Sequence, residues 1–402
     1  MQDIDTVVIG AGQAGLATSH ELKARGVEHV VLERGQIGQG WRDRWDSFCL
    51  VTPNWSVNLP GFPYDGDDPD GFMPRDEIVA YLERYAESFD APVRTGISIA
   101  SVGGGDGSGF AIGTDGEEFQ CRNLVLATGA FQKPLRPSGA ESLPDTVRVM
   151  DLGDFTSEAD LPPGDVLIVG SGQSGCQIAE ELTEAGRRVV LACGRAPWAL
   201  RRAAGKDLFW WLEKAGFFDT PADAMPEEAR LFANVLATGH DGGHDLHLRS
   251  LQAMGVELVG RFKGADASVA KFAPDLAENV AWGDVRYAQL RDAILATAEK
   301  LGVEVADLPE PEPFQADAPT EIDLTSFGTV LFTGGFRPDF SSWLPWSEAF
   351  DGDGFPLQSD GASTVIDGLF FVGVHFMRKR KSALLYGVGE DAGVVSDAIA
   401  AR

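Results

Sequence analysis

The sequence predicts an α/β protein that contains one strand–loop–helix–strand unit twice. In the first copy, Thr6 to Ile9 reads as a buried strand, and a glycine-rich loop, a helix and the strand His29 to Leu32 follow it. In the second copy, the strands Val166 to Val169 and Val189 to Ala192 flank the same loop and helix. Short apolar strands that alternate with helices predict parallel sheets, and a glycine loop after the first strand is typical of Rossmann-like units. We therefore expect two Rossmann-like domains.

Both glycine-rich loops follow the pattern G-x-G-x-x-G. The first is Gly10-Ala11-Gly12-Gln13-Ala14-Gly15, and the second is Gly170-Ser171-Gly172-Gln173-Ser174-Gly175. In this pattern the first glycine permits a tight turn, the second lets the backbone approach a pyrophosphate, and the third allows close helix–strand packing. The helix N-terminus then offers N–H groups and a positive dipole end to the phosphates. Two matched copies favour dinucleotide binding over the alternative that the glycines form only flexible turns.

The residues after each second strand distinguish the two dinucleotides. Glu33 ends the second strand of the first unit, where a carboxylate can accept hydrogen bonds from an adenosine ribose, and we expect FAD there. The equivalent position of the second unit is Cys193, and Arg195, Arg201 and Arg202 follow it. Arginine near this position accommodates a 2′-phosphate, so the pattern favours NADPH over NADH. Arg201 and Arg202 could instead form a solvated basic turn.

Composition and charge exclude several classes of protein. The chain has 402 residues, of which 33 are Lys or Arg and 61 are Asp or Glu, and its formal net charge is −28. At about 100–200 residues per domain, this length fits about two to four domains. A surface this acidic repels nucleic acid and anionic lipid, so neither nucleic acid nor membrane is an expected partner. Without a recognisable secretory signal, apolar spanning run or C-x-x-C pair, the sequence predicts a protein of the reducing cytoplasm.

Further motifs follow the first unit and close the chain. Gly40 to Trp45 has the form G-W-x-x-x-W, and Leu124 to Gly129 reads as a strand that ends in Ala-Thr-Gly. Val330 to Gly335 echoes that strand, Asp367 to Gly373 reads as another buried strand, and Gly387 opens the last helix. With these motifs in this order, the chain resembles the class B flavin-dependent monooxygenases, which comprise flavin-containing, N-hydroxylating and Baeyer–Villiger enzymes. It is most similar to the bacterial branch named for flavoproteins of potassium transport.

The resemblance extends from Val7 to about Ala400 and implies a glutathione-reductase-like architecture, in which an NADPH domain interrupts a FAD domain. The FAD domain would comprise residues 1–155 and 316–402. The NADPH domain would comprise residues 160–315, with an aromatic-rich helical insertion at about 198–280. The implied FAD contacts are Gly10, Gly12, Gln13, Ala14, Gly15, Glu33, Arg34, Gly40, Trp41, Trp45, Thr128, Gly129 and Asp391. The implied NADPH contacts are Gly170, Gly172, Gln173, Ser174, Gly175, Arg195 and Arg202.

The family chemistry supplies the expected function. NADPH would reduce FAD, O₂ would add at flavin C4a, and the resulting C4a-(hydro)peroxyflavin would transfer one oxygen atom to a small, apolar or aromatic substrate. Asp151 stands about where a family signature has histidine, so Baeyer–Villiger oxidation is less supported than monooxygenation in general. The partners would be the substrate and O₂, and a homodimer with a second copy of the chain is left open. Two alternatives are an NAD(P)H-dependent flavin oxidoreductase with another acceptor, and a non-catalytic redox-sensing flavoprotein that regulates a transporter.

Several polar residues have two alternative roles in this scheme. Asn54 and Asn58 are candidates for a catalytic position near the flavin C4a–N5 edge, although asparagine in such a loop is often a turn former. Asp391 either contacts the flavin or caps the last helix. The basic run Arg378 to Lys381 either forms a solvated turn or attracts NADPH or an anionic substrate. His375 is expected in the core or behind the site rather than as a base.

The insertion is rich in aromatic and histidine residues. Its aromatic side chains would build a local core, line a substrate tunnel, or both; they are Trp198, Phe209, Trp210, Trp211, Phe217, Phe218 and Phe232. The three histidines His240, His244 and His247 have the residue type of metal ligands. Gly242 and Gly243 interrupt any regular helix or strand between them, so no metal site is predicted.

Overall fold

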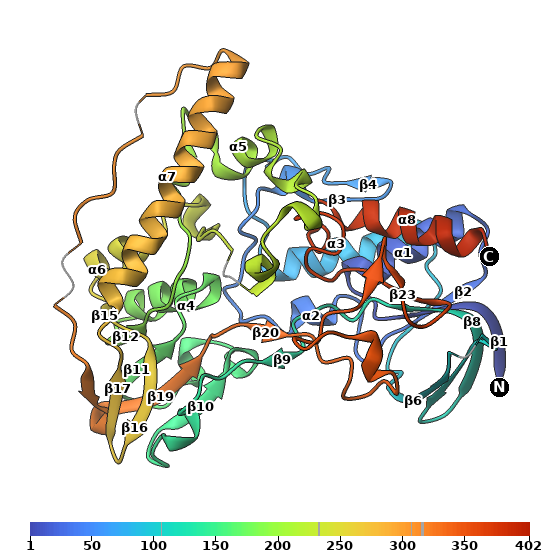
Figure 1. Ribbon diagram of the computed structural model, residues 1–402, viewed down its shortest axis with the longest axis horizontal. Coiled ribbons are helices and arrows are strands. Elements are labelled where there is room, and N and C mark those ends of the chain that lie inside the picture. Colours follow the sequence, from blue (N-terminus) through green and yellow to red (C-terminus); the bar gives the residue numbers. More distant parts are fainter. Residues whose placement is uncertain (106, 232–233, 307, 315–316) are drawn as a thin grey trace.

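The computed structural model describes residues 1–402 except 106, 232–233, 307 and 315–316 (Figure 1). Two β-sheets lie in opposite halves of the molecule, and helices pack against both. Both chain termini lie in the half that contains the first sheet, at the right of Figure 1. The chain therefore leaves this half, builds the second sheet and returns.

The first sheet carries the first glycine-rich loop. Five strands are parallel in the order β23-β8-β1-β2-β5, and β6, β7, β21 and β22 extend the sheet by antiparallel pairing. The strands are β1 Gln2–Ile9, β2 His29–Leu32, β5 Val93–Arg94, β6 Ile99–Gly104, β7 Phe110–Thr114, β8 Glu118–Leu126, β21 Gln358–Ser359, β22 Ala362–Ser363 and β23 Leu369–Phe371.

Helices α1 (Gln13–Ala24), α3 (Arg75–Ser88) and α8 (Val388–Ala400) contribute to one core of this half, together with apolar side chains of the sheet. Phe340 and Phe350 of a long loop help to form the other core, on β7, β8 and β23. Both faces of the central strands are thus covered, which explains why Val7, Val8, Leu124 and Val125 are fully buried. The short elements α2 (Gln39–Arg42), β3 (Asn58–Leu59) and β4 (Phe62–Pro63) lie in the segment between β2 and α3.

The second sheet carries the second glycine-rich loop. All five strands are parallel, in the order β10-β19-β11-β12-β15. They are β10 Arg148–Asp151, β11 Asp165–Val169, β12 Val189–Ala192, β15 Glu257–Val259 and β19 Phe327–Phe332. The predicted boundaries at residues 155 and 316 place β10 and β19 in the FAD domain, but both strands pair in the second sheet. The reason is that an apolar run such as Phe327–Phe332 fits the middle of either parallel sheet, so its own pattern does not select a partner.

The remaining elements of this half surround the second sheet. The helices are α4 (Gln173–Glu184), α5 (Leu208–Lys214), α6 (Leu248–Met254) and α7 (Leu276–Leu301). Strands β16 (Phe262–Asp266), β17 (Val269–Phe272) and β18 (Glu321–Asp323) form a small antiparallel sheet, and β13 (Arg202–Ala203) pairs with β14 (Lys206–Asp207). The 26-residue helix α7 lies along the outer side of this half (Figure 1).

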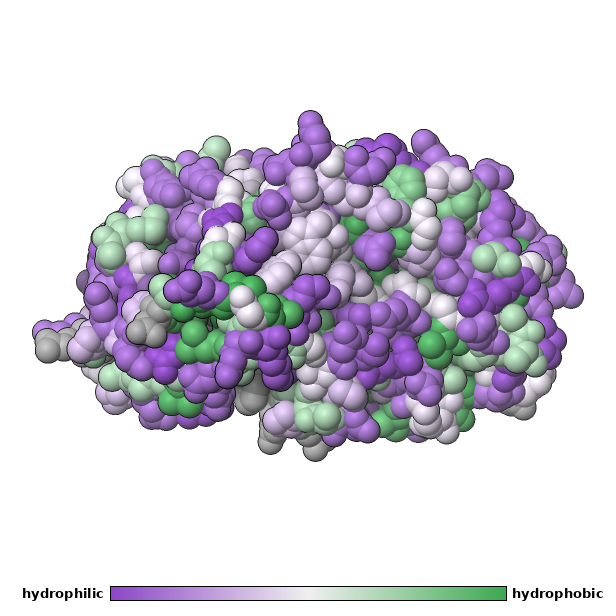
Figure 2. Space-filling model, turned by 90° about the horizontal axis from the view of Figure 1, so that it is seen from above, coloured by the Kyte–Doolittle hydropathy of each residue, from purple (hydrophilic) through white to green (hydrophobic). Residues whose placement is uncertain are grey.

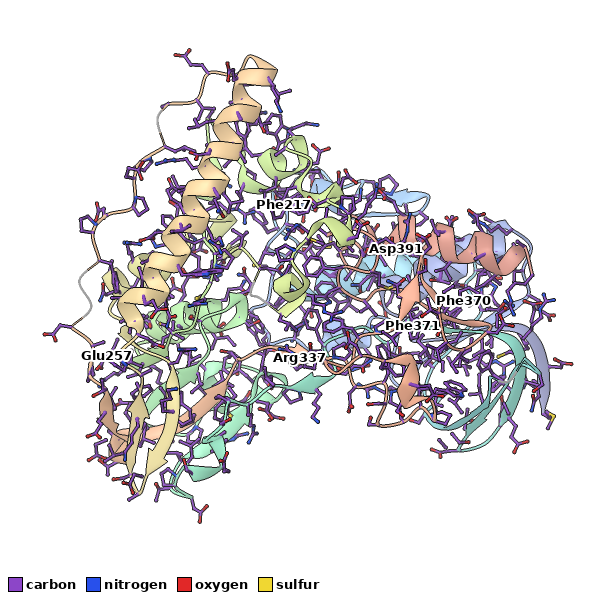
Figure 3. All side chains as sticks on the ribbon, in the orientation of Figure 1. Phe217, Glu257, Arg337, Phe370, Phe371 and Asp391 are labelled. Carbon is purple, nitrogen blue, oxygen red and sulfur yellow. The ribbon has the colours of Figure 1, made fainter. Side chains whose placement is uncertain are left out.

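Two crossings connect the halves. Strand β9 (Lys133–Pro134) lies on the outward path and β20 (Phe336–Arg337) on the return path, and the two pair antiparallel. Figure 1 and the labelled Arg337 in Figure 3 place this two-stranded ribbon between the sheets.

The outer surface is largely polar. Hydrophilic residues dominate the face shown in Figure 2, and the hydrophobic residues there form separate patches. In the part of the chain that the structure describes, no helix combines the length and apolar character needed to cross a membrane.

Candidate functional site

The first glycine-rich loop has the geometry of a phosphate cradle. Gly10 has a φ of +105°, in the region that favours glycine. A Cβ on Gly15 would lie 1.8 Å from the carbonyl oxygen of Gly10, so only glycine lets α1 begin this close to the loop. Gly12 is the N-cap of α1 without a side-chain cap, and the position of its missing Cβ has nothing within 4 Å. The N–H groups of the first turn can therefore face a pyrophosphate.

The second glycine-rich loop repeats this geometry. Gly170 has a φ of +118°, and a Cβ on Gly175 would lie 1.9 Å from the Gly170 carbonyl oxygen. Gly172 is the N-cap of α4, again without a side-chain cap. The hydroxyl of Thr333, directly after β19, donates to the Gly170 carbonyl oxygen at 2.7 Å. The echo of the Ala-Thr-Gly motif in the sequence therefore marks a strand end that supports this loop.

Glu33 is fixed at the end of β2. One carboxylate oxygen accepts from the N–H of Ala11 at 2.8 Å, and the other accepts from the N–H of Gly35 at 2.9 Å. The residue is only 7% exposed and lies beside the glycine-rich loop, where a ribose would follow the pyrophosphate. Its neighbour Arg34 is exposed.

Two glutamines at the same position of the two loops bind other segments. The Gln13 side chain accepts from Trp41 Nε1 at 2.9 Å and donates to the Ala383 carbonyl oxygen at 3.3 Å. The Gln173 side chain donates to the Ala237 carbonyl oxygen and accepts from the Ala237 N–H, the latter at 3.1 Å. Each glutamine therefore ties its loop to a segment far away in the sequence. The cofactor contacts expected for both glutamines stay a prediction, and their identical position in the repeat was the available signal for a shared structural role.

The loop Gly40 to Trp45, which carries the G-W-x-x-x-W motif and is called the tryptophan loop below, contacts both halves. Trp41 reaches the first glycine-rich loop through Gln13, whereas Trp45 is 3% exposed and belongs to the core of the second half. The Trp45 ring packs edge-to-face on Phe48 at a centroid distance of 5.0 Å. Gly40, at the start of the motif, is exposed. The structure thus places Trp45 against α4.

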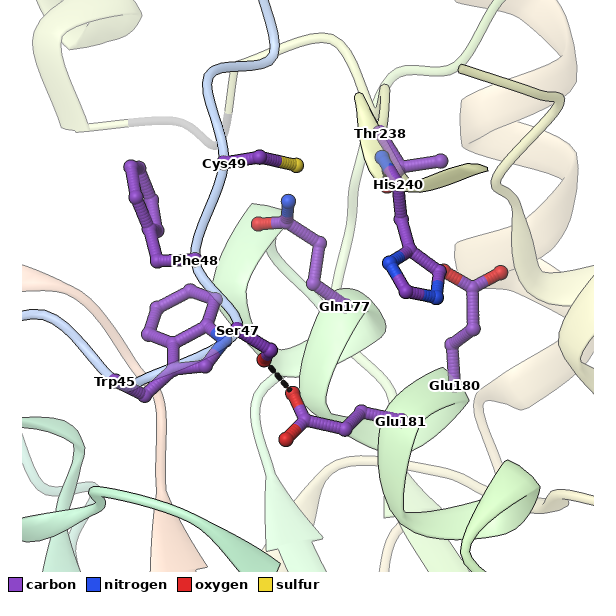
Figure 4. A pocket seen from close by; sticks show the side chains of 9 residues that line it. All are labelled: Trp45, Ser47, Phe48, Cys49, Gln177, Glu180, Glu181, Thr238 and His240. Carbon is purple, nitrogen blue, oxygen red and sulfur yellow. Dashed lines mark hydrogen bonds between the residues drawn. The ribbon is translucent and has the colours of Figure 1, made fainter. Parts of the chain in front are cut away.

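A small pocket lies between the tryptophan loop and α4 (Figure 4). Its lining residues are Trp45, Ser47, Phe48, Cys49, Gln177, Glu180, Glu181, Thr238 and His240. The Ser47 hydroxyl donates to Glu181 at 2.6 Å across it. The space of about 20 Å³ holds about one water molecule, so this pocket is too small for an organic substrate.

The Ala-Thr-Gly segment turns the chain toward the ribbon. Gly129 has a φ of +74°, and the Gln132 side chain donates to the Thr128 hydroxyl and to the Gly129 carbonyl oxygen, both at 2.8 Å. Phe131 follows with 55% exposure, and its ring meets the His375 ring edge-to-face at 4.7 Å. Thr128 and Gly129 therefore lie at the point where the chain leaves the first half.

The two asparagine candidates differ. Asn54 is 5% exposed; its amide donates to the Asp68 carbonyl oxygen at 2.9 Å and accepts from the Met73 N–H at 2.7 Å. Both ends of this side chain hold the loop, as the turn-forming alternative predicts. Asn58 is exposed on β3.

The three arginines after β12 have different environments. Arg195 pairs with Glu278 at 3.1 Å, and the Arg202 guanidinium donates to the carbonyl oxygens of Gly242 and Gly243 at 2.7 and 2.6 Å. Arg202 is therefore engaged by backbone.

Arg201 is 3% exposed, and the expectation that it lies in a solvated turn is wrong. Its guanidinium pairs with Asp207 at 2.7 Å, donates to the Val51 carbonyl oxygen at 2.9 Å and stacks on Phe72 at 4.3 Å. Burial lowers the pKa of Arg201 and raises that of Asp207. Arg201 thus joins the two halves.

The basic run before α8 is neutralised within the chain. Arg378 pairs with Asp360 at 2.9 Å, Lys379 with Glu390 at 2.8 Å, and Lys381 with Asp219 at 3.0 Å. The solvated-turn expectation is wrong for Lys381, which is 6% exposed. Attraction of NADPH or an anionic substrate by this run stays a prediction. Glu390 lies 11 residues after Lys379, whereas Asp219 comes from a distant segment that the sequence of the run does not reveal.

Asp391 lies in the first turn of α8 (Figure 3). The N-cap of the helix is Gly387, so the expectation that Asp391 caps the helix is wrong. The carboxylate is 1% exposed, lies 3.2 Å from the Arg378 guanidinium, and has one oxygen without a hydrogen-bond partner. Burial raises the pKa of Asp391 despite the nearby cation.

The aromatic insertion builds a core. Trp211 is fully buried, and Trp198 stacks on Tyr287 at a centroid distance of 4.1 Å. The Phe209 ring lies 4.2 Å from the Phe218 ring. The local-core expectation is therefore confirmed for these residues, whereas Phe232 lies outside the described residues.

The histidines of the insertion have separate partners. His244 Nε2 lies 2.6 Å from Glu180, His240 lies 3.5 Å from Glu184, and the His247 ring accepts from the Ser250 N–H at 3.0 Å. No group of three or more possible metal ligands occurs among the residues that the structure describes.

Sequence comparison places these features in a family. The sequence model of the pyridine nucleotide-disulphide oxidoreductases matches residues 7–212. The chain belongs to this family.

An uncharacterized oxidoreductase CzcO-like of Geobacillus kaustophilus is 31% identical over 391 residues, which cover 97% of this chain and 96% of the relative. Indole-3-pyruvate monooxygenase YUCCA6 of Arabidopsis thaliana is 31% identical over 205 residues, 49% of each chain. These relatives support the prediction of the class B flavin-dependent monooxygenase family, and the chain is an oxidoreductase by its family.

Solved structures confirm the predicted fold class. A flavin-containing monooxygenase from Stenotrophomonas maltophilia has a TM-score of 0.70 at 20% identity and covers 100% of this chain and 99% of that chain. The bacillithiol disulfide reductase from Bacillus cereus has a TM-score of 0.65 at 15% identity and covers 100% of both chains. The complex of OTEMO with FAD and NADP has a TM-score of 0.54 at 15% identity, over 99% of this chain and 84% of that chain.

Proposed function

We propose that the chain is a cytoplasmic, NADPH-dependent FAD monooxygenase that acts on a small apolar or aromatic substrate. FAD and NADP are the cofactors of this class of enzyme. In our proposal, FAD binds the first glycine-rich loop and NADPH the second. The FAD domain consists of residues 1–155 and 316–402 without β10 and β19, which belong with the NADPH domain. The observation that carries the proposal is the duplicated loop geometry: two uncapped helix starts, each behind a glycine at positive φ.

The chain's own groups would bind and orient the cofactors. The first-turn N–H groups of α1 and α4 would hold the two pyrophosphates, and Glu33 would accept from a ribose hydroxyl. Helix α8 begins at Gly387 without a side-chain cap, so its N–H groups could stabilise negative charge on the flavin pyrimidine. FAD and NADPH, held by these groups, would supply the redox chemistry and the activation of O₂.

An aromatic cluster supports the proposed substrate class. The rings of Trp55 and Phe209 lie 5.5 Å apart, and Tyr386 contacts Trp55, Phe209 and Phe218 at 6.2, 5.6 and 6.0 Å. These side chains come from the loop beside Asn54, from the insertion and from the segment before α8. Aromatic rings recognise apolar and aromatic groups. The indole-3-pyruvate monooxygenases among the relatives act on a substrate with such a group.

The test follows the oxygen atom. Purified protein with bound FAD is incubated with NADPH, isotopically labelled O₂ and a panel of aryl sulfides, aryl ketones and aryl oxo acids. We expect NADPH oxidation and one labelled oxygen atom in a product. NADPH oxidation without any labelled product, together with anaerobic reduction of a quinone or disulfide, would contradict the proposal in favour of an oxidoreductase with another acceptor.

A further inference from the structure

The second Rossmann-like unit has no acidic residue directly after its second strand, but helix α7 places an acidic side chain near this strand end. Cys193 occupies the position at which the first unit has Glu33, directly after the second strand. Glu278, in the first turn of α7, places a carboxylate oxygen 3.1 Å from an Arg195 guanidinium nitrogen. A carboxylate and a guanidinium therefore lie together at the end of β12.

Two buried contacts fix this arrangement. The Asn279 amide donates to the Cys193 carbonyl oxygen at 3.1 Å, and Asn279 is 3% exposed. The Ser171 hydroxyl, in the glycine-rich loop itself, accepts from the Gly194 N–H at 3.0 Å. The start of α7, the end of β12 and the glycine-rich loop are thus connected by hydrogen bonds, which hold the backbone at Glu278 near the end of β12.

The two charges favour different nucleotides. In Rossmann-like domains a carboxylate at this strand end accepts from the ribose 2′-hydroxyl of NADH, whereas an arginine accommodates the 2′-phosphate of NADPH. Both side chains are half or more exposed, at 50% for Arg195 and 70% for Glu278, so a nucleotide can reach them. Before a 2′-phosphate can pair with Arg195, Glu278 must give up its ion pair with the same guanidinium.

We infer that Glu278 sets the coenzyme selectivity of this chain: it competes with the 2′-phosphate for Arg195 and offers an acceptor to a 2′-hydroxyl, so that it weakens the preference of the site for NADPH over NADH. The inference rests on the proposed function, because it assumes that the second loop binds a nicotinamide dinucleotide.

The test compares two adenosine nucleotides that differ only in the 2′-phosphate. Oxidised, FAD-loaded protein is titrated by calorimetry at low salt with adenosine 2′,5′-bisphosphate and with adenosine 5′-monophosphate. Glu278→Gln keeps the side-chain shape and removes the charge. We expect it to tighten bisphosphate binding about two- to fivefold, the range of an exposed ion pair, and to leave monophosphate binding equal or weaker.

The matched control is Glu299→Gln, which removes the same charge from an exposed position of the same helix. At about 1.5 Å per residue, this position is roughly 30 Å from Glu278. Equal bisphosphate affinity in Glu278→Gln and Glu299→Gln would overturn the inference and leave the proposed function intact. Failure of the wild-type protein to bind either nucleotide would contradict the proposed function, and the inference with it.

Discussion

His375 is a single side chain whose protonation is coupled to folding. It follows β23, its ring lies against Phe131, and its Nδ1 is buried without a hydrogen-bond partner. Burial lowers the pKa of His375 from its ordinary value of 6.5 to about 4. The neutral imidazole is thus the form that this environment accepts, which agrees with the expectation of a packed residue rather than a base.

Because the pKa of this histidine is lower in the folded protein, its contribution to stability is complete above about pH 6.5 and is lost as the pH falls toward 4. In the wild type, protonation of His375 lowers the unfolding free energy as the pH falls from about 7 to about 4.5. We expect this fall to be about 2–3 kcal/mol smaller in His375→Phe. Urea unfolding at the two pH values measures this difference. His240→Phe, at a partly buried position of the insertion, is the control, and the wild-type pH dependence in His375→Phe would refute the assignment.

At the scale of elements, the two glycine-rich loops differ in sequence but not in construction. In each, a Cβ on the third glycine would lie less than 2 Å from the first glycine's carbonyl oxygen, at 1.8 Å for Gly15 and 1.9 Å for Gly175. A methyl group at either position must push the helix away from its strand. Each helix start can therefore be displaced separately.

We expect Gly15→Ala to abolish FAD retention, because the shifted α1 no longer directs its first-turn N–H groups at a pyrophosphate. Gly175→Ala should keep FAD and lose nucleotide binding at the second loop. Flavin absorbance after purification and calorimetric titration with NADP⁺ separate the two results. Gly116→Ala, which adds a methyl group in open space, should match the wild type; the opposite pattern, with FAD lost from Gly175→Ala alone, would reverse the cofactor assignment.

Elements with local signals were predictable from the sequence, and long-range partners were not. The strand Val189–Ala192 has the predicted bounds, because turn residues delimit a short apolar run. The pairing of β19 and the acidic partners of Lys379 and Lys381 depend on segments that meet only in the folded chain. Likewise, the sequence contains Glu278 but nothing that places it beside Arg195.

At the scale of the whole molecule, ion pairs connect the insertion to the last helix, α8. Asp219 of the insertion lies 3.0 Å from both Lys379 and Lys381, and both lysines also pair with Glu390 of α8. Backbone hydrogen bonds from Arg380 and Lys381 to the insertion accompany these ion pairs. The lysine hydrogen bonds lower the pKa of Asp219, so the link is lost on acidification through this carboxylate.

Removal of Asp219 should loosen this connection without disrupting either half. We expect Asp219→Asn to lower the Tm by about 2–4 °C and to increase amide hydrogen exchange in residues 217–222 and 378–381 together. Asp223→Asn, at an exposed site nearby, should have neither effect. Faster exchange confined to one of the two segments would show that the ion pairs do not couple them.

The ribbon of β9 and β20 restricts how the two halves can move. A single linker would let them swivel freely, but here the outward and return crossings pair as antiparallel strands, with Phe336 opposite Pro134 and Arg337 opposite Lys133, and the Leu135 N–H donates to the Gly335 carbonyl oxygen at 2.9 Å. Two joined strands oppose torsion about their length more than they oppose flexing across it. Any reorientation must therefore carry both crossings together, so the permitted motion is a bend with one principal direction, like that of a strap hinge.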